Sequence, residues 1–195
     1  MSESEKTVTN ISIRATYDSL GDVLGPRARD MIFRNAGMGR VLESVPDYTW
    51  EKNYTNAELV MLYYKTVDLV GVVGAQGILR QMGYTNAEKT DQVLRILDQF
   101  TDLSPKELLY KGFELLKTAI NRGDVENGIG DVPQFNVHDC TMCRGVVSRK
   151  PYCSPYAGAL QYFTDRAFGR GEYLVIETKC KAKGDDTCLF ELRQR

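Results

Sequence analysis

Five cysteines and the only histidine of this chain lie in the last third of its 195 residues. An odd number of cysteines, without a secretory signal, does not suit a framework of disulfides. A group of thiols with one imidazole is typical of a metal site or a redox site. The residues are His138, Cys140, Cys143, Cys153, Cys180 and Cys188.

The composition is that of a globular protein, with 43% hydrophobic and 26% charged residues and a formal net charge of −1. A charge near zero disfavours a non-specific nucleic-acid binder. No apolar run reaches the roughly 18 residues that span a membrane. Residues 1–7 lack the basic and apolar regions of a signal peptide. We therefore expect a cytoplasmic protein with no membrane span and no nucleic-acid partner.

The first two-thirds of the chain carry the signals of helices. We expect a frayed N-terminus over residues 1–10 and a helical part over 11–125 within one domain, 11–195. A capping box, in which Ser or Thr is followed three residues later by Glu, predicts a helix start at three places. These are Thr55 with Glu58, Thr85 with Glu88, and Ser104 with Glu107.

Three glycines, Gly71, Gly74 and Gly77, recur at a spacing of three within an apolar stretch. Small residues at this spacing let another helix approach closely. The stripe leaves tight internal packing, a dimer seam and a ligand cleft as interpretations.

The pattern changes after a turn-rich connector over residues 123–131. Short β-rich segments predict strands over 132–138, 144–149, 172–179 and 187–193, and the pattern of Tyr156–Phe168 predicts a helix between the two pairs. The predicted fold class is α+β. A helical N-terminal two-thirds packs on the antiparallel sheet of a C-terminal β-β-α-β-β module, residues 130–195.

The last hairpin brings candidate metal ligands together. Cys180 and Cys188 flank a tight turn at Gly184, and Glu177 precedes the first of them by three residues. Zinc prefers four ligands in a tetrahedron, drawn from thiolates, imidazoles and carboxylates. The hairpin supplies three, and Cys153 is the first candidate for the fourth.

The run from Glu177 to Phe190, Glu-x-x-Cys-x-Ala-x-Gly-Asp-x-x-Cys-x-Phe, resembles the C-terminal signature of the vinyl-4-reductase domain family. Cys153, followed by Gly158, resembles the upstream part of that signature. The resemblance implies hydrocarbon or small-molecule binding, and a fold related to Bet3-type tethering subunits and haem nitric-oxide-binding domains. It also implies one structural zinc per chain, held by Cys153, Glu177, Cys180 and Cys188.

The segment from His138 to Cys143 departs from that family pattern. Cys140 and Cys143 form a Cys-x-x-Cys pair, which is a common metal clip and a common redox pair. One of them can displace a zinc ligand, or the pair can bind a second metal or a cluster with His138. They can also be merely buried or redox-labile thiols.

A zinc with four protein ligands is closed to substrate, so function is expected in an apolar cavity between sheet and helices. Tyr152, Tyr156, Tyr162 and Phe163 are the candidate lining residues, because they flank Cys153 and the helix after it. The first hypothesis is a non-catalytic binding or sensing domain for a hydrophobic or aromatic small molecule, acting as a homodimer. Such a domain signals through a partner protein, because the chain has no P-loop.

Other functions stay open at this point. One is an accessory factor or reductase component in tetrapyrrole metabolism, which the family name suggests, although no nucleotide-binding glycine motif supports a reductase. Another is a redox or iron-sulfur protein that uses Cys140 and Cys143. Haem is a further alternative cofactor, with His138 as its ligand. An enzyme is less favoured than a binding domain.

Overall fold

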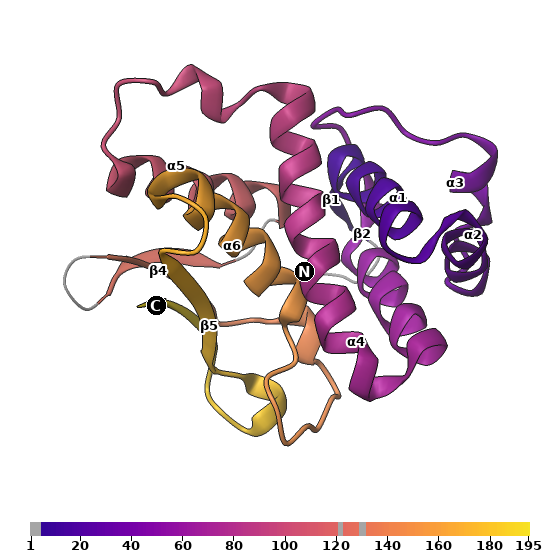
Figure 1. Ribbon diagram of the computed structural model, residues 1–195. Coiled ribbons are helices and arrows are strands. Elements are labelled where there is room, and N and C mark those ends of the chain that lie inside the picture. The colour runs from indigo at the N-terminus through magenta and orange to yellow at the C-terminus, as the bar shows by residue number, and fades with distance from the viewer. Residues whose placement is uncertain (1–4, 121–122, 129–131) are drawn as a thin grey trace.

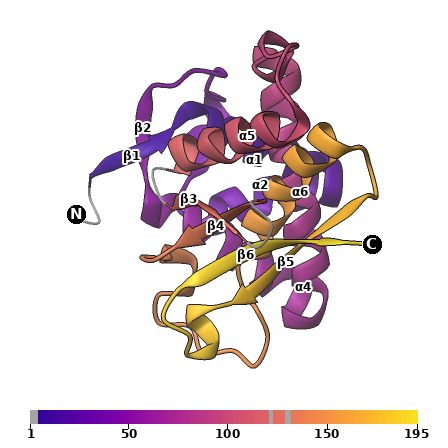
Figure 2. The same cartoon turned by 90° about the vertical axis from the view of Figure 1, so that its left-hand side faces the viewer.

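The computed structural model describes residues 5–120, 123–128 and 132–195 (Figure 1). Helices form most of the first part of the chain, and the C-terminal part forms an antiparallel sheet with one helix, so the predicted α+β class is confirmed. Two helices, α5 and α6, lie on the same side of the four-stranded sheet (Figure 2). The long helix α4 then packs against α6, and α1 packs against α4.

The N-terminal segment is a strand where a frayed end was expected. Strand β1 (Lys6–Thr9) pairs antiparallel with β2 (Lys52–Thr55), and Val8 is fully buried. The chain is held here because Val8 joins the core and Thr9 caps the next helix, α1 (Asn10–Leu24), by accepting from the backbone of Ser12. Helices α2 (Pro26–Asn35) and α3 (Gly39–Glu43) follow.

Helix α4 (Asn56–Leu94) begins at the predicted capping box of Thr55 and Glu58. The second predicted start, at Thr85, is wrong, because the helix continues through it. An N-cap needs extended backbone, whereas the residues before Thr85 are helical and packed on α6. The side chain of Asn86 hydrogen-bonds to Ser19 and Thr16 of α1 and so ties the two helices together.

The third capping box is confirmed. After η1 (Leu97–Gln99), helix α5 (Pro105–Ile120) begins behind Ser104. The carboxylate of Glu107 accepts from the backbone N–H of Ser104 at 2.8 Å, and the hydroxyl of Ser104 accepts from the backbone N–H of Glu107 at 3.4 Å.

The C-terminal sheet has the strand order β3-β4-β6-β5, with every neighbouring pair antiparallel. Its first strand, β3 (Asp124–Asn127), lies in the segment that the sequence analysis took for a connector. The strand expected over 144–149 is absent from the described part of the chain: η3 (Thr141–Cys143) and a loop follow β4 (Pro133–Val137) instead. The remaining elements are α6 (Ser154–Phe168), β5 (Tyr173–Lys179), η4 (Lys181–Lys183) and β6 (Cys188–Gln194).

Close packing between helices occurs at Gly83 of α4 and Gly158 of α6. A Cβ atom built on Gly83 meets the carbonyl oxygen of Pro155 at 1.9 Å, and one on Gly158 meets that of Arg80 at 1.9 Å. By contrast, a Cβ on Gly71, Gly74 or Gly77 meets nothing within 4 Å. The stripe of three glycines is therefore not a site of tight internal packing. Gly71 interrupts α4 with a φ of 76°.

The hydrophobic core runs between the sheet, α6, α4 and α1. Among the described residues, no helix is both long and apolar enough to cross a membrane.

Candidate metal centre and apolar cavity

The five thiols gather at one end of the C-terminal sheet, where four segments meet. Cys140 and Cys143 flank the short helix η3, Cys153 is the N-cap of α6, Cys180 follows β5 and Cys188 opens β6. Strand pairing explains the convergence, because Val137 at the end of β4 lies opposite Cys188. All five side chains are buried, none more than 6% exposed.

The sulfur atoms lie within contact distance without forming disulfides. Cys143 Sγ is 3.2 Å from that of Cys153 and 3.6 Å from those of Cys180 and Cys188. Cys153 Sγ is 3.3 Å from Cys140 Sγ and 3.7 Å from Cys188 Sγ. The sulfurs of a tetrahedral zinc site, at about 2.3 Å from the ion, are about 3.8 Å apart. The cluster thus has the spacing of thiolates that share one ion.

This spacing bears on the iron-sulfur alternative. In an iron-sulfur cluster the thiolates bind different iron atoms, with inorganic sulfide between the irons, so their sulfurs stand further apart than around one ion. The sulfurs of Cys143, Cys153 and Cys188 are 3.2 to 3.7 Å apart. The donor set therefore fits single metal ions better than a cluster.

Backbone N–H groups support two of the sulfurs. Tyr152 N–H donates to Cys180 Sγ at 3.3 Å, and Lys181 N–H donates to Cys188 Sγ at 3.4 Å. Such hydrogen bonds stabilise negative charge on sulfur and orient metal ligands. Contacts within the cluster, those with Cys140 foremost, lower the pKa of Cys143 and raise that of Cys153.

Glu177 of β5 faces the same centre and is only 8% exposed. Its Oε2 accepts from the backbone N–H of Cys153 at 2.9 Å, whereas its Oε1 has no hydrogen-bond partner. Burial, followed by the hydrogen bond with Cys180, raises the pKa of Glu177 to about 9. A buried carboxylate oxygen without a partner is what a bound cation satisfies.

Two sets of four donors lie close enough to surround an ion. In each set the ligand atoms are within 4.8 Å of one another, and every residue is buried. The first set is Cys140, Cys143, Cys153 and Cys188; the second is Cys153, Glu177, Cys180 and Cys188. The second contains the residues that the family resemblance implies.

His138 does not belong to either set. It lies in the turn after β4, and its side chain is 63% exposed. Its Nε2 atom lies 3.3 Å from the amide nitrogen of Asn136 and 3.8 Å from a carboxylate oxygen of Glu126. The imidazole is thus directed to the sheet surface and not to the described thiols.

An apolar cavity of about 90 Å³ lies between α1, α4, α5 and α6. Two of the predicted lining residues, Tyr156 and Phe163, line it; Tyr152 and Tyr162 do not. Tyr152 packs on Tyr64 beside the metal centre, with ring centroids 6.5 Å apart, and the hydroxyl of Tyr162 donates to Asp91 at 2.6 Å. The remaining lining residues include Ile11, Trp50, Leu59, Tyr63, Ala87, Leu116, Ile120, Pro155 and Ala159.

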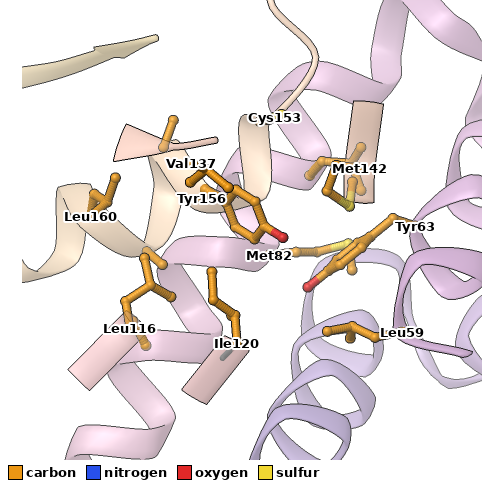
Figure 3. Packing of buried hydrophobic residues seen from close by; sticks show 14 of the residues in the cluster. Leu59, Tyr63, Met82, Leu116, Ile120, Val137, Met142, Cys153, Tyr156 and Leu160 are labelled. Atoms are coloured by element: carbon orange, nitrogen blue, oxygen red, sulfur yellow. The ribbon is translucent and has the colours of Figure 1, made fainter. Parts of the chain in front are cut away.

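The hydroxyl groups of Tyr63 and Tyr156 point toward the same space, beside Ile120 (Figure 3). Burial raises the pKa of both tyrosines, so both are neutral and able to donate a hydrogen bond. The sequence analysis missed Tyr63. Its spacing of four from Leu59, on one face of a helix, is the signal that places both on the cavity side.

The metal centre and the cavity share the first turn of α6. Cys153 begins this turn on the side of the thiols, and Pro155 and Tyr156 line the cavity two and three residues later. The backbone N–H of Tyr156 donates to the carbonyl of Cys153 at 3.0 Å. A shift at one site is thus transmitted to the other through a single turn of helix.

The segment that supplies all these donors, from β4 to β6, also decides the family comparison. Residues 133–194 match the vinyl-4-reductase domain family. The match confirms the family resemblance seen in the cysteine pattern. The matched segment contains all five cysteines and Glu177, whereas α1 to α5 lie outside it.

Solved structures resemble the chain over nearly its whole length. An H-NOX protein from S. oneidensis in the Fe(II)NO ligation state has a TM-score of 0.64 and 11% identity, covering 96% of this chain and 99% of the other. A structure concerned with heme distortion in the H-NOX family has a TM-score of 0.63 and 15% identity, covering 98% and 95%. At this identity the likeness shows the fold alone. No match was found among curated proteins.

Proposed function

We propose that this chain is a non-catalytic binding or sensing domain for a small hydrophobic or aromatic molecule, with a structural zinc held by Cys153, Glu177, Cys180 and Cys188. The observation that carries the proposal is the shared first turn of α6, which borders both the thiol centre and the apolar cavity. The match to the vinyl-4-reductase domain supports it, as does the fold shared with an H-NOX protein in the Fe(II)NO ligation state.

The cavity defines the class of ligand. Its lining is mainly apolar, and the hydroxyls of Tyr63 and Tyr156 supply polar contacts. A cavity of about 150 Å³ accommodates benzene, and this one measures about 90 Å³. A one-ring ligand therefore requires a small shift of the lining. Trp50, which lines the cavity and is 43% exposed, has room to make it.

Haem is not part of the proposal. The only imidazole of the chain, that of His138, is exposed at the sheet surface and does not line the cavity. A cavity of about 90 Å³ is also much smaller than a haem macrocycle. The residues present here thus do not fit a histidine-ligated haem in this cavity.

Zinc fits the donor chemistry of the second set. Three thiolates and one carboxylate leave no open coordination position, so the ion would stabilise the fold and take no part in a reaction. Cys153 would fix the start of α6, Cys180 and Cys188 the two strands of the hairpin, and Glu177 the middle of β5. The cavity wall formed by α6 would be held in place by this centre.

Ligand binding is tested by thermal unfolding with toluene and with phenol as probes. We expect both to raise the melting temperature of the metal-loaded protein, with phenol favoured because the tyrosine hydroxyls can pair with its hydroxyl. Ala159→Leu fills the cavity and should abolish both shifts, whereas Ala167→Leu, outside the cavity on the same helix, should retain them. An Ala159→Leu variant with undiminished shifts would refute the assigned cavity, and no shift in the wild type would refute the proposed function.

A further inference from the structure

The thiol centre holds more donors than one tetrahedral ion can use. Five cysteines and Glu177 point at one buried region, and each is at most 8% exposed. One tetrahedral ion takes four ligands. If only Cys153, Glu177, Cys180 and Cys188 bind, Cys140 and Cys143 stay beside the ion as unused thiols.

The two sets of donors overlap in a specific way. Each contains four residues, and both contain Cys153 and Cys188, whose sulfurs are 3.7 Å apart. Two tetrahedra that share two corners share an edge. In zinc–thiolate chemistry, a thiolate at such a shared corner bridges two ions.

We propose that this centre binds two soft divalent metal ions, bridged by the thiolates of Cys153 and Cys188. Cys140 and Cys143 complete the first site, and Glu177 and Cys180 complete the second. The inference rests on the metal site of the proposed function and adds to it a second ion, with Cys140 and Cys143 as its ligands.

The two-ion arrangement uses every donor. Five thiolates and one carboxylate carry six negative charges, and two divalent ions leave a net charge of −2. One ion with four thiolates leaves the same net charge, so the second ion adds no uncompensated buried charge. The protons of the five thiols and of Glu177 pass to solvent as the ions bind. The unpartnered Oε1 of Glu177 gains a cation.

A single-ion arrangement competes with this one. Cys143 Sγ lies 3.6 Å from the sulfurs of both Cys180 and Cys188, so it can replace Glu177 as the fourth ligand of one ion. Cys140 and Glu177 would then bind no metal. The two arrangements differ in the number of ions and in the role of Cys140.

Metal stoichiometry separates them. The purified full-length chain is stripped of metal under anaerobic and reducing conditions, titrated with zinc alone and measured by native mass spectrometry. We expect two zinc ions per wild-type chain and one in Cys140→Ser. Thr141→Ala, a change between the two cysteines at a side chain that binds no metal, should still take up two. A saturating value of one zinc in the wild type would overturn the proposal.

A second measurement requires no variant that might fail to fold. With cadmium-113 in place of zinc, nuclear magnetic resonance of the wild type should show two signals of equal area, one from a four-sulfur site and one from a site with three sulfurs and one oxygen. A single signal would overturn the two-ion proposal and leave the structural zinc and the ligand cavity standing. Absence of any bound metal would refute the zinc site as well.

Discussion

Glu58 is held at the first turn of α4 by several polar contacts. Its carboxylate accepts from the backbone N–H of Thr55 at 2.8 Å and from the Arg40 guanidinium at 2.7 Å. Burial opposes ionisation of Glu58, but the hydrogen bonds from Thr55 and Arg40 outweigh it and lower the pKa. The ionised carboxylate therefore stabilises the folded state.

Glu58→Gln should reveal this contribution as a dependence on pH. A lowered pKa in the folded state gives stability that is fully present above the unfolded value, about 4.5, and is lost as the pH falls through the folded value. We expect the variant to be less stable than wild type at pH 7 and nearly equal at pH 3, by thermal unfolding. Glu43→Gln, at an exposed position, should match wild type at both.

Tyr162 and Asp91 form a second informative pair, and this one joins α6 to α4. The hydroxyl of Tyr162 donates to Asp91 at 2.6 Å, and the other oxygen of Asp91 accepts from the backbone N–H of Leu97 at 2.9 Å. Asp91 is 6% exposed, so its carboxylate depends on these partners.

Tyr162→Phe should lower the free energy of unfolding by about 1.5–3 kcal/mol, because it removes a hydrogen bond to a buried charged group. Urea denaturation followed by circular dichroism measures the change. Tyr110→Phe, at a tyrosine that is 40% exposed on α5, serves as the control and should stay within about 0.5 kcal/mol of wild type. A Tyr162→Phe variant as stable as wild type would mean that Asp91 finds another partner.

At the scale of elements, local signals predicted the helix starts only where the preceding chain is extended. Thr55 and Ser104 follow non-helical residues and act as caps, whereas Thr85 lies inside α4 although it has the same motif. The motif states what a cap looks like, but packing of α4 on α6 decides that the helix continues. Similarly, β3 was missed because Asp124–Asn127 has no alternating apolar pattern and forms by pairing with β4.

The crossing of α4 and α6 gives the sharpest prediction for an element. Gly158→Ala places a methyl group where the Arg80 carbonyl lies, and we expect it to destabilise the fold by at least about 3 kcal/mol. Gly77→Ala, exposed on α4 with nothing near its Cβ, should instead be neutral or stabilising by up to about 1 kcal/mol. Melting temperatures of both variants test the pair, and an unaffected Gly158→Ala would contradict the close crossing.

At the scale of the whole molecule, the metal centre joins segments that are distant in sequence. The proximity of Cys180 and Cys188 could be predicted from the hairpin alone. The inclusion of Cys140 and Cys143 could not, because it depends on the pairing of β4 with β6, which sets Val137 opposite Cys188. Likewise, the cavity needs α1 and α5 as walls, and no local pattern states that they meet.

Removal of metal should therefore destabilise the protein as a whole. A ligand present at about 1,000 times its Kd stabilises the folded state by about 4 kcal/mol. We expect a strong chelator under reducing conditions to lower the melting temperature of the wild type markedly, and added zinc to restore it. Cys188→Ser, which lacks a donor common to both sets, should melt lower and respond little to the chelator. Equal melting with and without chelator would indicate that the centre adds no stability.

The backbone contacts at Gly83 and Gly158 also limit how this sequence can diverge. A clash with a side chain can be relieved by a second substitution that shortens the facing residue. Here the facing atoms are the carbonyl oxygens of Pro155 and Arg80, which every amino acid carries. No compensating substitution exists, so we expect both positions to admit glycine alone in any descendant that keeps this helix crossing, however far the surrounding residues drift.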